Sequence, residues 1–270
     1  MRDTEEAAAH RPVASPLRRA PDTHFRRAPA AAFASMLLCA AAQSGEFPNG
    51  VAAGDVDQTS VVLWARVTEA GPVRFEVSRT ADFATIDVFA ETAVSDPMVP
   101  VKVQITGLSS GTRYWHRATD VEGDAAPGSF RTPHAAGTHG LRCGVSGDGR
   151  GELRPYVSVR NIPSRDLDFF VALGDTVYAD VPSLDFPFPQ AATAAEFRLK
   201  HNEGYSSRLG FNTLAAARAA TAFYACIDDH EVTNDFAGGA PPATDSRFDR
   251  TGDFINETAS FTNAMQVFHE

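Results

Sequence analysis

The chain has 270 residues, of which 43% are hydrophobic, so it can bury an ordinary core, and its length suggests two domains of moderate size. This composition argues against disorder of the whole chain. The formal net charge is -10, which argues against binding to duplex nucleic acid, because affinity for a phosphate backbone comes largely from clustered Lys and Arg. If the substrate carries phosphate, bound metal ions would have to attract it.

The first 45 residues have the order of a secretory signal. Six arginines and no lysine precede an uncharged stretch over residues 28–42, which ends in three alanines before Gln43. This stretch is shorter than the roughly 20 apolar residues that span a membrane. We therefore expect a removed signal, a mature chain without a transmembrane segment, and export to the periplasm or the medium. Two arginine pairs leave the twin-arginine route open, and the alternative is a disordered leader with no targeting role.

Residues 46–134 predict an all-β sandwich of the immunoglobulin or fibronectin type. Strand-like runs recur at residues 60–67, 73–77, 99–105, 113–117 and 128–131, and several of them alternate apolar and polar residues. Tyr114 resembles the tyrosine corner of such domains, in which the hydroxyl ties a strand to an upstream backbone group. His116 is expected to be a hydrogen-bonded core residue or a surface residue, and Trp64 and Trp115 to be core anchors.

From about residue 140 the pattern changes to α/β. Buried strands are predicted at residues 141–146, 168–173 and 222–227, with a crossover helix before residue 165 and a helical stretch over residues 194–220. We expect Cys143 and Cys226 to be small buried thiols in these strands, and the three cysteines do not indicate a disulfide framework.

Each of these three strands is followed by carboxylates, namely Asp148, Asp175 and Asp229. In parallel α/β sheets the carboxyl ends of neighbouring strands meet at one edge, which is where ligand sites gather. Like charges gathered there are costly unless protons or cations neutralise them, and metal ions are the usual remedy. For a single aspartate, the alternative is a helix N-cap.

Three blocks of sequence carry a resemblance. Ser146-Gly-Asp148, residues 174–180 (GDTVYAD) and residues 228–235 (DDHEVTND) resemble successive motifs of the calcineurin-like metallophosphoesterases in their PhoD-like form, the alkaline phosphatase or phosphodiesterase D family. The segment ahead of them is similar to that family's N-terminal domain. The resemblance implies hydrolysis of phosphate mono- or diesters by a metal-activated water at a multinuclear metal site.

The same resemblance assigns roles to residues. It implies that Asp175 bridges two metals, that Tyr178 binds a ferric ion as a phenolate, and that Asp148 and Asp229 are further ligands. His230 would lie beside the phosphate and donate a proton to the leaving oxygen, and the alternative is that it orients a metal ligand.

Weaker candidates flank these motifs. Arg150 could bind non-bridging phosphate oxygens, with a surface salt bridge as the alternative. Asn234 and Asp180 are candidates for substrate contact, but a loop-capping role is preferred for each.

The identity of the metals stays open at this point. The family implies iron together with calcium, but its members often carry a cysteine in the first motif, where this chain has Ser146. An all-oxygen ligand set favours calcium, magnesium or manganese, and zinc is a further alternative. The expected partner is a small phosphate ester, with phospholipids and nucleotides both open.

Related enzymes draw further ligands, several of them histidines, from later motifs. After Asp148 this chain offers His201, which we expect to be exposed on a helix, His230 and His269. We therefore expect residues 140–270 to form a partial metallophosphoesterase domain of a C-terminally truncated chain, whose last strand presents an unpaired edge and which binds metal weakly with little hydrolysis. The rival interpretation is an exported non-catalytic binding protein that uses the β-sandwich, with a degenerate phosphatase half.

Overall fold

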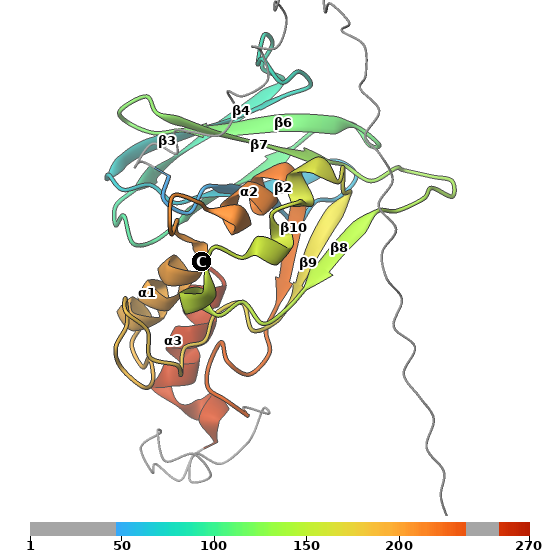
Figure 1. Ribbon diagram of the computed structural model, residues 1–270. Helices are drawn as coiled ribbons and strands as arrows, with labels where there is room; N and C mark the ends of the chain where they lie inside the picture. The colour runs from blue at the N-terminus through green and yellow to red at the C-terminus, as the bar shows by residue number, and fades with distance from the viewer. Residues whose placement is uncertain (1–46, 236–253) are drawn as a thin grey trace, which may run out of the picture. The chain divides into compact units, whose positions relative to one another are not determined.

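The computed structural model describes residues 47–235 and 254–270, which belong to one compact unit (Figure 1). The expected signal over residues 1–45 lies outside the described residues. A six-stranded sheet contains, in spatial order, β5 (Val101–Thr106), β2 (Ser60–Ala65), β1 (Val51–Gly54), β10 (Ala222–Cys226), β9 (Phe169–Leu173) and β8 (Cys143–Ser146). A four-stranded sheet contains β4 (Val88–Val94), β3 (Gly71–Ser78), β6 (Arg113–Thr119) and β7 (Ala125–Arg131).

Alternating side chains of the first seven strands build the largest core. In β2, Val61, Leu63 and Ala65 are fully buried, and β3 contributes Phe75 and Val77 to the same cluster. Because successive side chains of a strand point to opposite faces, one face of each sheet can be apolar throughout. Each such side chain removed from water contributes about 1.5 to 3 kcal/mol. The sequence analysis missed β1 and β4, which are short or only partly buried.

The structure contains the hydrogen bond that defines a tyrosine corner, which confirms that prediction. The backbone N–H of Ser109 donates a hydrogen bond to the Tyr114 hydroxyl at 2.8 Å, and the ring of Tyr114 stacks on Phe130 with centroids 5.7 Å apart. The side chain is 1% exposed, so the hydroxyl needs a partner inside the protein. This contact ties β6 to the loop that precedes it.

A parallel pairing of β1 with β10 joins the two halves of the chain into one sheet. Ala53 lies opposite Ala222, while β10 pairs on its other side with β9. Strands from both sides of the expected boundary at residues 134–140 therefore share a sheet. The expectation that the last strand has an unpaired edge is wrong, because β1 covers that edge.

The connection from β8 to β9 is not an α-helix, contrary to the prediction. It contains three single-turn 3-10 helices, η1 (Gly151–Leu153), η2 (Val157–Val159) and η3 (Ile162–Ser164). Pro155 and Pro163 lack the N–H groups that a continuous helix needs, and Gly149 and Gly151 disfavour it further.

The predicted helical stretch over residues 194–220 is divided into two. The first helix, α1 (Ala194–Tyr205), begins with a capping box in which the backbone N–H of Glu196 donates to the Thr193 hydroxyl and the Glu196 carboxylate accepts from the Thr193 N–H. Asn212 caps α2 (Thr213–Ala220). The helix α3 (Ala259–Phe268) follows η5 (Ile255–Glu257) and packs on α1. Among the described residues, no helix combines the length and apolar character needed to cross a bilayer.

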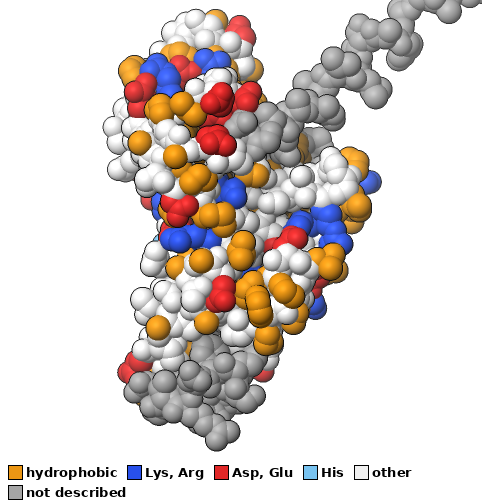
Figure 2. All heavy atoms as spheres, turned by 90° about the vertical axis from the view of Figure 1, so that its left-hand side faces the viewer, with side chains coloured by type: hydrophobic (Ala, Val, Ile, Leu, Met, Phe, Trp, Pro, Cys, Tyr) orange, Lys and Arg blue, Asp and Glu red, His pale blue; other side chains and the backbone are white. Residues whose placement is uncertain are grey.

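Cys143 and Cys226 are exposed, which corrects the prediction of buried thiols. They share a face of the β8–β9–β10 sheet with Val145 and Leu173, each 55% exposed. The opposite face, which carries Phe170, packs on η2, η3 and α2. The apolar runs of the sequence therefore predict the strands correctly but not which face is covered. Figure 2 shows other hydrophobic side chains on the surface, interspersed with charged ones.

His116 is buried but is not hydrogen-bonded, contrary to the expectation of a hydrogen-bonded core residue. Its side chain is 0% exposed, and neither ring nitrogen has a partner among the described residues. A Cβ on Gly128 would lie 2.4 Å from the His116 Nε2, which explains why glycine occupies that position of β7. Loss of solvation lowers the pKa of His116 to about 4.

We predict that His116 makes the fold sensitive to acid. The native ring stays neutral down to about pH 4, whereas the unfolded ring takes up a proton below its ordinary pKa of 6.5, so unfolding becomes easier as the pH falls through this window. The loss amounts to about 3 kcal/mol in the free energy of unfolding, from about 1.4 kcal/mol per pKa unit.

Urea unfolding at several pH values between 4 and 7 measures this effect. A His116→Leu variant should lose less stability over the window than the wild type, while a variant of the exposed His139 should behave like the wild type. Equal pH dependence in His116→Leu and the wild type would contradict the prediction.

Candidate functional site

The carboxyl ends of β8, β9 and β10 meet at one edge of the six-stranded sheet. The strand β9 lies between the other two and pairs in parallel with both. The loops that follow the strands carry Asp148, Asp175 and the run 228–231, respectively. A backbone hydrogen bond of 2.7 Å from Gly149 N to the Asp175 carbonyl oxygen holds the first loop against the second.

Two of these aspartates have a left-handed backbone. Asp148 has a φ of 57° and Asp175 a φ of 50°, a region that few non-glycine residues occupy, although aspartate tolerates it better than most. Gly174 precedes Asp175 with a φ of 85°, and a Cβ on it would lie 2.5 Å from the Cβ of Asp228. Glycine is therefore required where the second and third loops approach each other.

Glu231 holds the second and third loops together. Its side chain is 1% exposed, and its two carboxylate oxygens accept four hydrogen bonds. The donors are Asp175 N at 3.2 Å, Thr176 N at 2.6 Å, Thr176 Oγ1 at 2.8 Å and Asp228 N at 2.9 Å. The sequence analysis did not single out Glu231. The sequence did contain one signal, because Glu231 directly follows three charged or titratable residues at the end of a strand. A carboxylate buried at such a place needs several hydrogen-bond donors.

Tyr178 connects the first two loops. Its hydroxyl lies 2.9 Å from Asp175 Oδ2 and 3.1 Å from Asp148 Oδ1. Burial, followed by the two carboxylates, raises the pKa of the Tyr178 phenol. Burial also raises the pKa of the Asp175 carboxyl, while the hydrogen bond from Tyr178 opposes that shift. The side chain of Asp175 is thus at the centre of the group.

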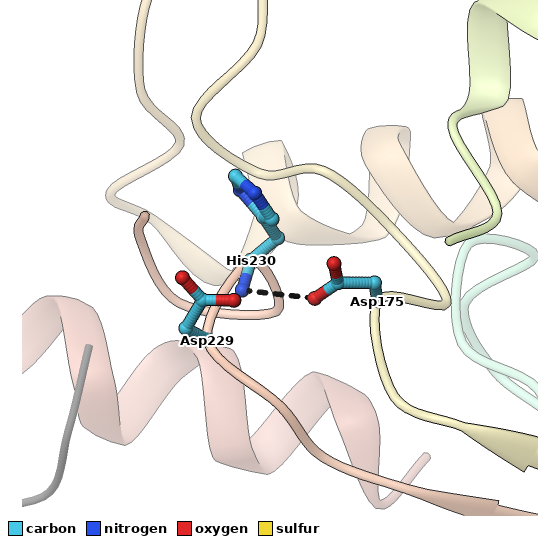
Figure 3. A group of neighbouring side chains, drawn as sticks. All are labelled: Asp175, Asp229 and His230. Carbon is cyan, nitrogen blue, oxygen red and sulfur yellow. Dashed lines mark hydrogen bonds between the residues drawn. The ribbon is translucent and has the colours of Figure 1, made fainter. Parts of the chain in front are cut away.

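Asp229 and His230 bring the third loop to the same place (Figure 3). Asp175, Asp229 and His230 each offer one ligand atom, and these atoms lie within 4.8 Å of one another. The Asp175 carboxylate also accepts a hydrogen bond of 3.4 Å from the backbone N–H of His230. Asp175 therefore belongs both to the group with Tyr178 and Asp148 and to the group with Asp229 and His230.

The imidazole ring of His230 is fixed on two sides. Its Nδ1 lies 2.8 Å from Asp180 Oδ1, and its ring stacks on Tyr178 with centroids 4.0 Å apart. Because a carboxylate only accepts, the proton of the neutral ring resides on Nδ1, and Nε2 keeps its lone pair. Asp180 also accepts from Asn234 N at 2.9 Å, so it caps the loop, as expected, and orients His230 as well.

Arg150 and Asn234 lie beside this group, with other partners. Arg150 forms an ion pair with Glu152 in which its Nε and Nη2 both donate to Oε1, and its guanidinium carbon lies 5.5 Å from the centre of the Tyr178 ring. The side chain of Asn234 is exposed and donates to Asp235 at 2.5 Å. In the described part of the chain, neither side chain donates a hydrogen bond to Asp148, Asp175 or Asp229.

His201 and His269 lie away from the group. His201 is only partly exposed, packs near Phe268, and has a pKa lowered by burial to about 4, which corrects the expectation of an exposed helical residue. His269 is exposed at the end of α3.

The donor set of the group fits cations. Carboxylates of Asp148, Asp175 and Asp229 converge with a phenol oxygen and an imidazole nitrogen, and no Lys or Arg among the described residues forms an ion pair with these three carboxylates within 4.0 Å. The Tyr178 hydroxyl proton alone bridges Asp148 and Asp175. Of the three carboxylates, Asp175 is buried, Asp229 is partly exposed and Asp148 is exposed, so a cation would chiefly offset the cost of the buried charge at Asp175.

Family models match both halves of the sequence. The model described as PhoD-like phosphatase, N-terminal domain, matches residues 31–134, and the model described as PhoD-like phosphatase matches residues 145–270. The chain belongs to the PhoD-like phosphatase family. The resemblance inferred from the three motifs is thereby confirmed.

Individual relatives agree with this membership. Alkaline phosphatase D of Bacillus subtilis (strain 168) is 26% identical over 219 residues, which cover 72% of this chain and 37% of that protein. A solved structure of PhoD matches with a TM-score of 0.69 at 23% identity, over 85% of this chain and 46% of that chain. At this identity the structural likeness shows the fold. The chain spans less than half the length of both relatives.

We predict that Glu231→Gln lowers the free energy of unfolding by about 2 kcal/mol, the cost of leaving buried donors without acceptors. One carboxylate oxygen accepts from the two donors of Thr176 and the other from Asp175 N and Asp228 N. A glutamine must turn its NH2 group toward one of these pairs of donors. Chemical denaturation in the presence of a chelator measures the change without a contribution from metals.

The matched control is Glu91→Gln, which neutralises a side chain that is 56% exposed and ion-paired with Arg74. Exposed ion pairs contribute about 0 to 1 kcal/mol, so this variant should unfold nearly as the wild type does. Similar losses in the two variants would contradict the role given to Glu231.

Proposed function

We propose that the protein hydrolyses phosphate mono- or diesters with a metal-activated water at a multinuclear metal site. One observation carries the proposal: side chains from the ends of three neighbouring strands converge, with Asp175 shared between the Tyr178–Asp148 contact and the group with Asp229 and His230. Membership of the PhoD-like phosphatase family supports phosphoester chemistry at this place. Matches over both halves of the chain do not favour the rival interpretation of a non-catalytic binding protein.

Each member of the group has a part in this proposal. Asp148, Asp175, Tyr178 and Asp229 would hold the cations, which supply a water of lowered pKa and positive charge for the phosphoryl oxygens. Metal binding by Tyr178 requires that its phenol proton leave, and a cation beside it would offset the burial that now opposes ionisation. Tyr178 and the two aspartates that it contacts would then be the residues that hold the cation together.

His230 is placed to move a proton. With Nδ1 held by Asp180, the side chain presents Nε2 in a fixed orientation, from which a protonated ring would donate to the leaving oxygen. The stack on Tyr178 keeps the ring beside the metal ligands. Arg150 and Asn234 would contact substrate only after exchanging their present partners, Glu152 and Asp235.

For the metals we propose iron together with calcium, with zinc, magnesium and manganese as alternatives. Oxygen atoms dominate the ligand set, which suits hard cations, and Tyr178 suits a ferric ion. Cys143 lies within β8, exposed on a face of the sheet, and Ser146 hydrogen-bonds to the Gly147 carbonyl at 3.4 Å. Neither side chain enters the group, so the ligand set is proposed without sulfur.

The hydrolytic activity is proposed for a complete protein of the PhoD-like family. It assigns residues 46–134 to the β-sandwich domain and residues 140–270 to part of the metallophosphoesterase domain. The substrate is proposed to be a small phosphate ester, with a nucleotide or a phospholipid headgroup as variants of it. Export to the periplasm or the medium, with the twin-arginine route open, follows from the order of residues 1–45.

We predict that Asp175→Asn weakens the binding of calcium and iron at least tenfold, because it removes a negative charge from the only side chain that belongs to both halves of the described group. Equilibrium dialysis followed by elemental analysis measures bound metal per chain. Asp82→Asn, a change at an exposed aspartate, is the control and should bind as the wild type does. Equal metal content in Asp175→Asn and the wild type would remove the basis of the proposal.

We also predict a spectroscopic signature of Tyr178. If a ferric ion binds the phenolate, the protein loaded with iron should absorb visible light through charge transfer from oxygen to iron. Tyr178→Phe should lose this band, while Tyr224→Phe, a change at a partly buried tyrosine whose hydroxyl bonds to the Val56 backbone instead, should keep it. A band of unchanged intensity in Tyr178→Phe would show that another group holds the iron.

A further inference from the structure

A second site lies on the outer face of the sandwich half of the six-stranded sheet. A cavity of about 490 Å³ is lined by residues of β1, β2 and β10, by α1 and α2, and by the end of α3. None of the proposed metal ligands lines it. A volume of this size lies within the range of pockets that bind small molecules.

Arg218 is the most unusual residue of this cavity. It is 6% exposed, its Nη1 has no hydrogen-bond partner, and no carboxylate among the described residues lies within ion-pair distance of it. Its guanidinium carbon lies 4.2 Å from the centre of the Trp64 ring and 4.5 Å from that of Tyr205. The aromatic rings offset part of the cost of burying the cation, but they leave its N–H groups without acceptors.

Arg66 faces the same cavity from β2. Its Nε and Nη1 are buried and also lack a partner, and it forms no ion pair with the described part of the chain. Burial lowers the pKa of both Arg66 and Arg218, although a guanidinium stays charged at neutral pH. One buried and one partly buried guanidinium group, each with buried N–H donors that lack a partner, lie in this one cavity, and an anion could accept from both.

The rest of the lining agrees with an anion. Lys102 and Arg198 add positive charge, and Arg198 is already paired with Glu270 at 2.6 Å. The carboxylates in the lining are Asp55 and Glu270. Aromatic side chains that include Trp64, Tyr205 and Phe268 supply flat apolar surface beside the guanidinium groups.

We propose that this cavity binds a small organic anion, in which a carboxylate or phosphate group accepts from Arg66 and Arg218 while an attached aromatic or other flat apolar group packs on the neighbouring rings. Guanidinium groups bind such oxygens in pairs with matched geometry. The cavity volume is about three times the roughly 150 Å³ of an engineered cavity that holds benzene, so it accommodates a ring together with its acidic group. This site is separate from the proposed metal centre and does not depend on the proposed function.

Calorimetric titration of the 270-residue protein in the presence of a chelator tests the proposal. The probes are phenylphosphonate, benzoate and inorganic phosphate. Comparison of the first two distinguishes a phosphonate from a carboxylate group, and comparison of phenylphosphonate with inorganic phosphate measures the contribution of the ring. We expect at least one of the two aryl anions to bind more tightly than inorganic phosphate. Asp175→Asn should bind them as the wild type does, which separates this site from the metal centre.

Variants of the two arginines identify the site. Arg66→Met and Arg218→Met should each weaken binding of the aryl anion at least about tenfold, because a charged hydrogen-bonding group is removed. Arg160→Met, which removes the same charge from an exposed position, should bind as the wild type does. Without any anion, Arg218→Met should melt no lower than the wild type, since it removes a buried charge that lacks a partner.

Two results would overturn the proposal. The first is that neither aryl anion binds to the wild type at millimolar concentration. The second is that Arg66→Met binds the aryl anions as tightly as the wild type does. Because Arg66 is more exposed than Arg218, its variant should fold even if that of Arg218 does not.

Discussion

The arrangement of the candidate centre depends on one buried carboxylate, that of Glu231. It does not belong to the converging ligand group, yet it gathers N–H and O–H donors from the loops after β9 and β10. Asp175 and Thr176 donate to it from the buried loop after β9, and Asp228 donates from the loop after β10, so the two loops are held in one relative position. The proposed ligands Asp175 and Asp229 lie in the two loops that Glu231 joins, which brings together side chains 54 residues apart in the sequence.

The sandwich half contributes to this arrangement through the sheet. Pairing of β1 with β10 places the third strand of the site between two neighbours, and β10 in turn fixes the register of β9. The same junction creates the outer face that α1, α2 and α3 enclose, where Arg218 is buried beside aromatic rings and Arg66 is partly buried in the same cavity. The two halves of this PhoD-like chain are thus connected by backbone hydrogen bonds as well as by the linker over residues 134–140.

Sequence reasoning predicted the local features well and the long-range ones poorly. Period-two alternation found five of the first seven strands, and the Asp-rich strand ends indicated which side chains converge, because both signals are carried by neighbouring residues. The β1–β10 pairing, the clamp by Glu231 and the exposure of Cys143 depend on which distant segments meet, and no spacing in one sequence encodes that. The β8–β9 connection was predicted as a helix although Pro155 and Pro163 argued against it. His116 and His201 were judged from their neighbours in the sequence, and their burial depends on packing partners far along the chain.

The central claim is that Asp148, Asp175, Tyr178 and Asp229 share bound cations. X-ray diffraction from crystals grown with iron and calcium, with data collected on both sides of the iron absorption edge, tests it most directly. We expect anomalous density between the Asp175 carboxylate and the Tyr178 hydroxyl, within coordination distance of Asp148 or Asp229. Metal density found only elsewhere on the protein, with these four side chains still bonded to one another as they are now, would contradict it.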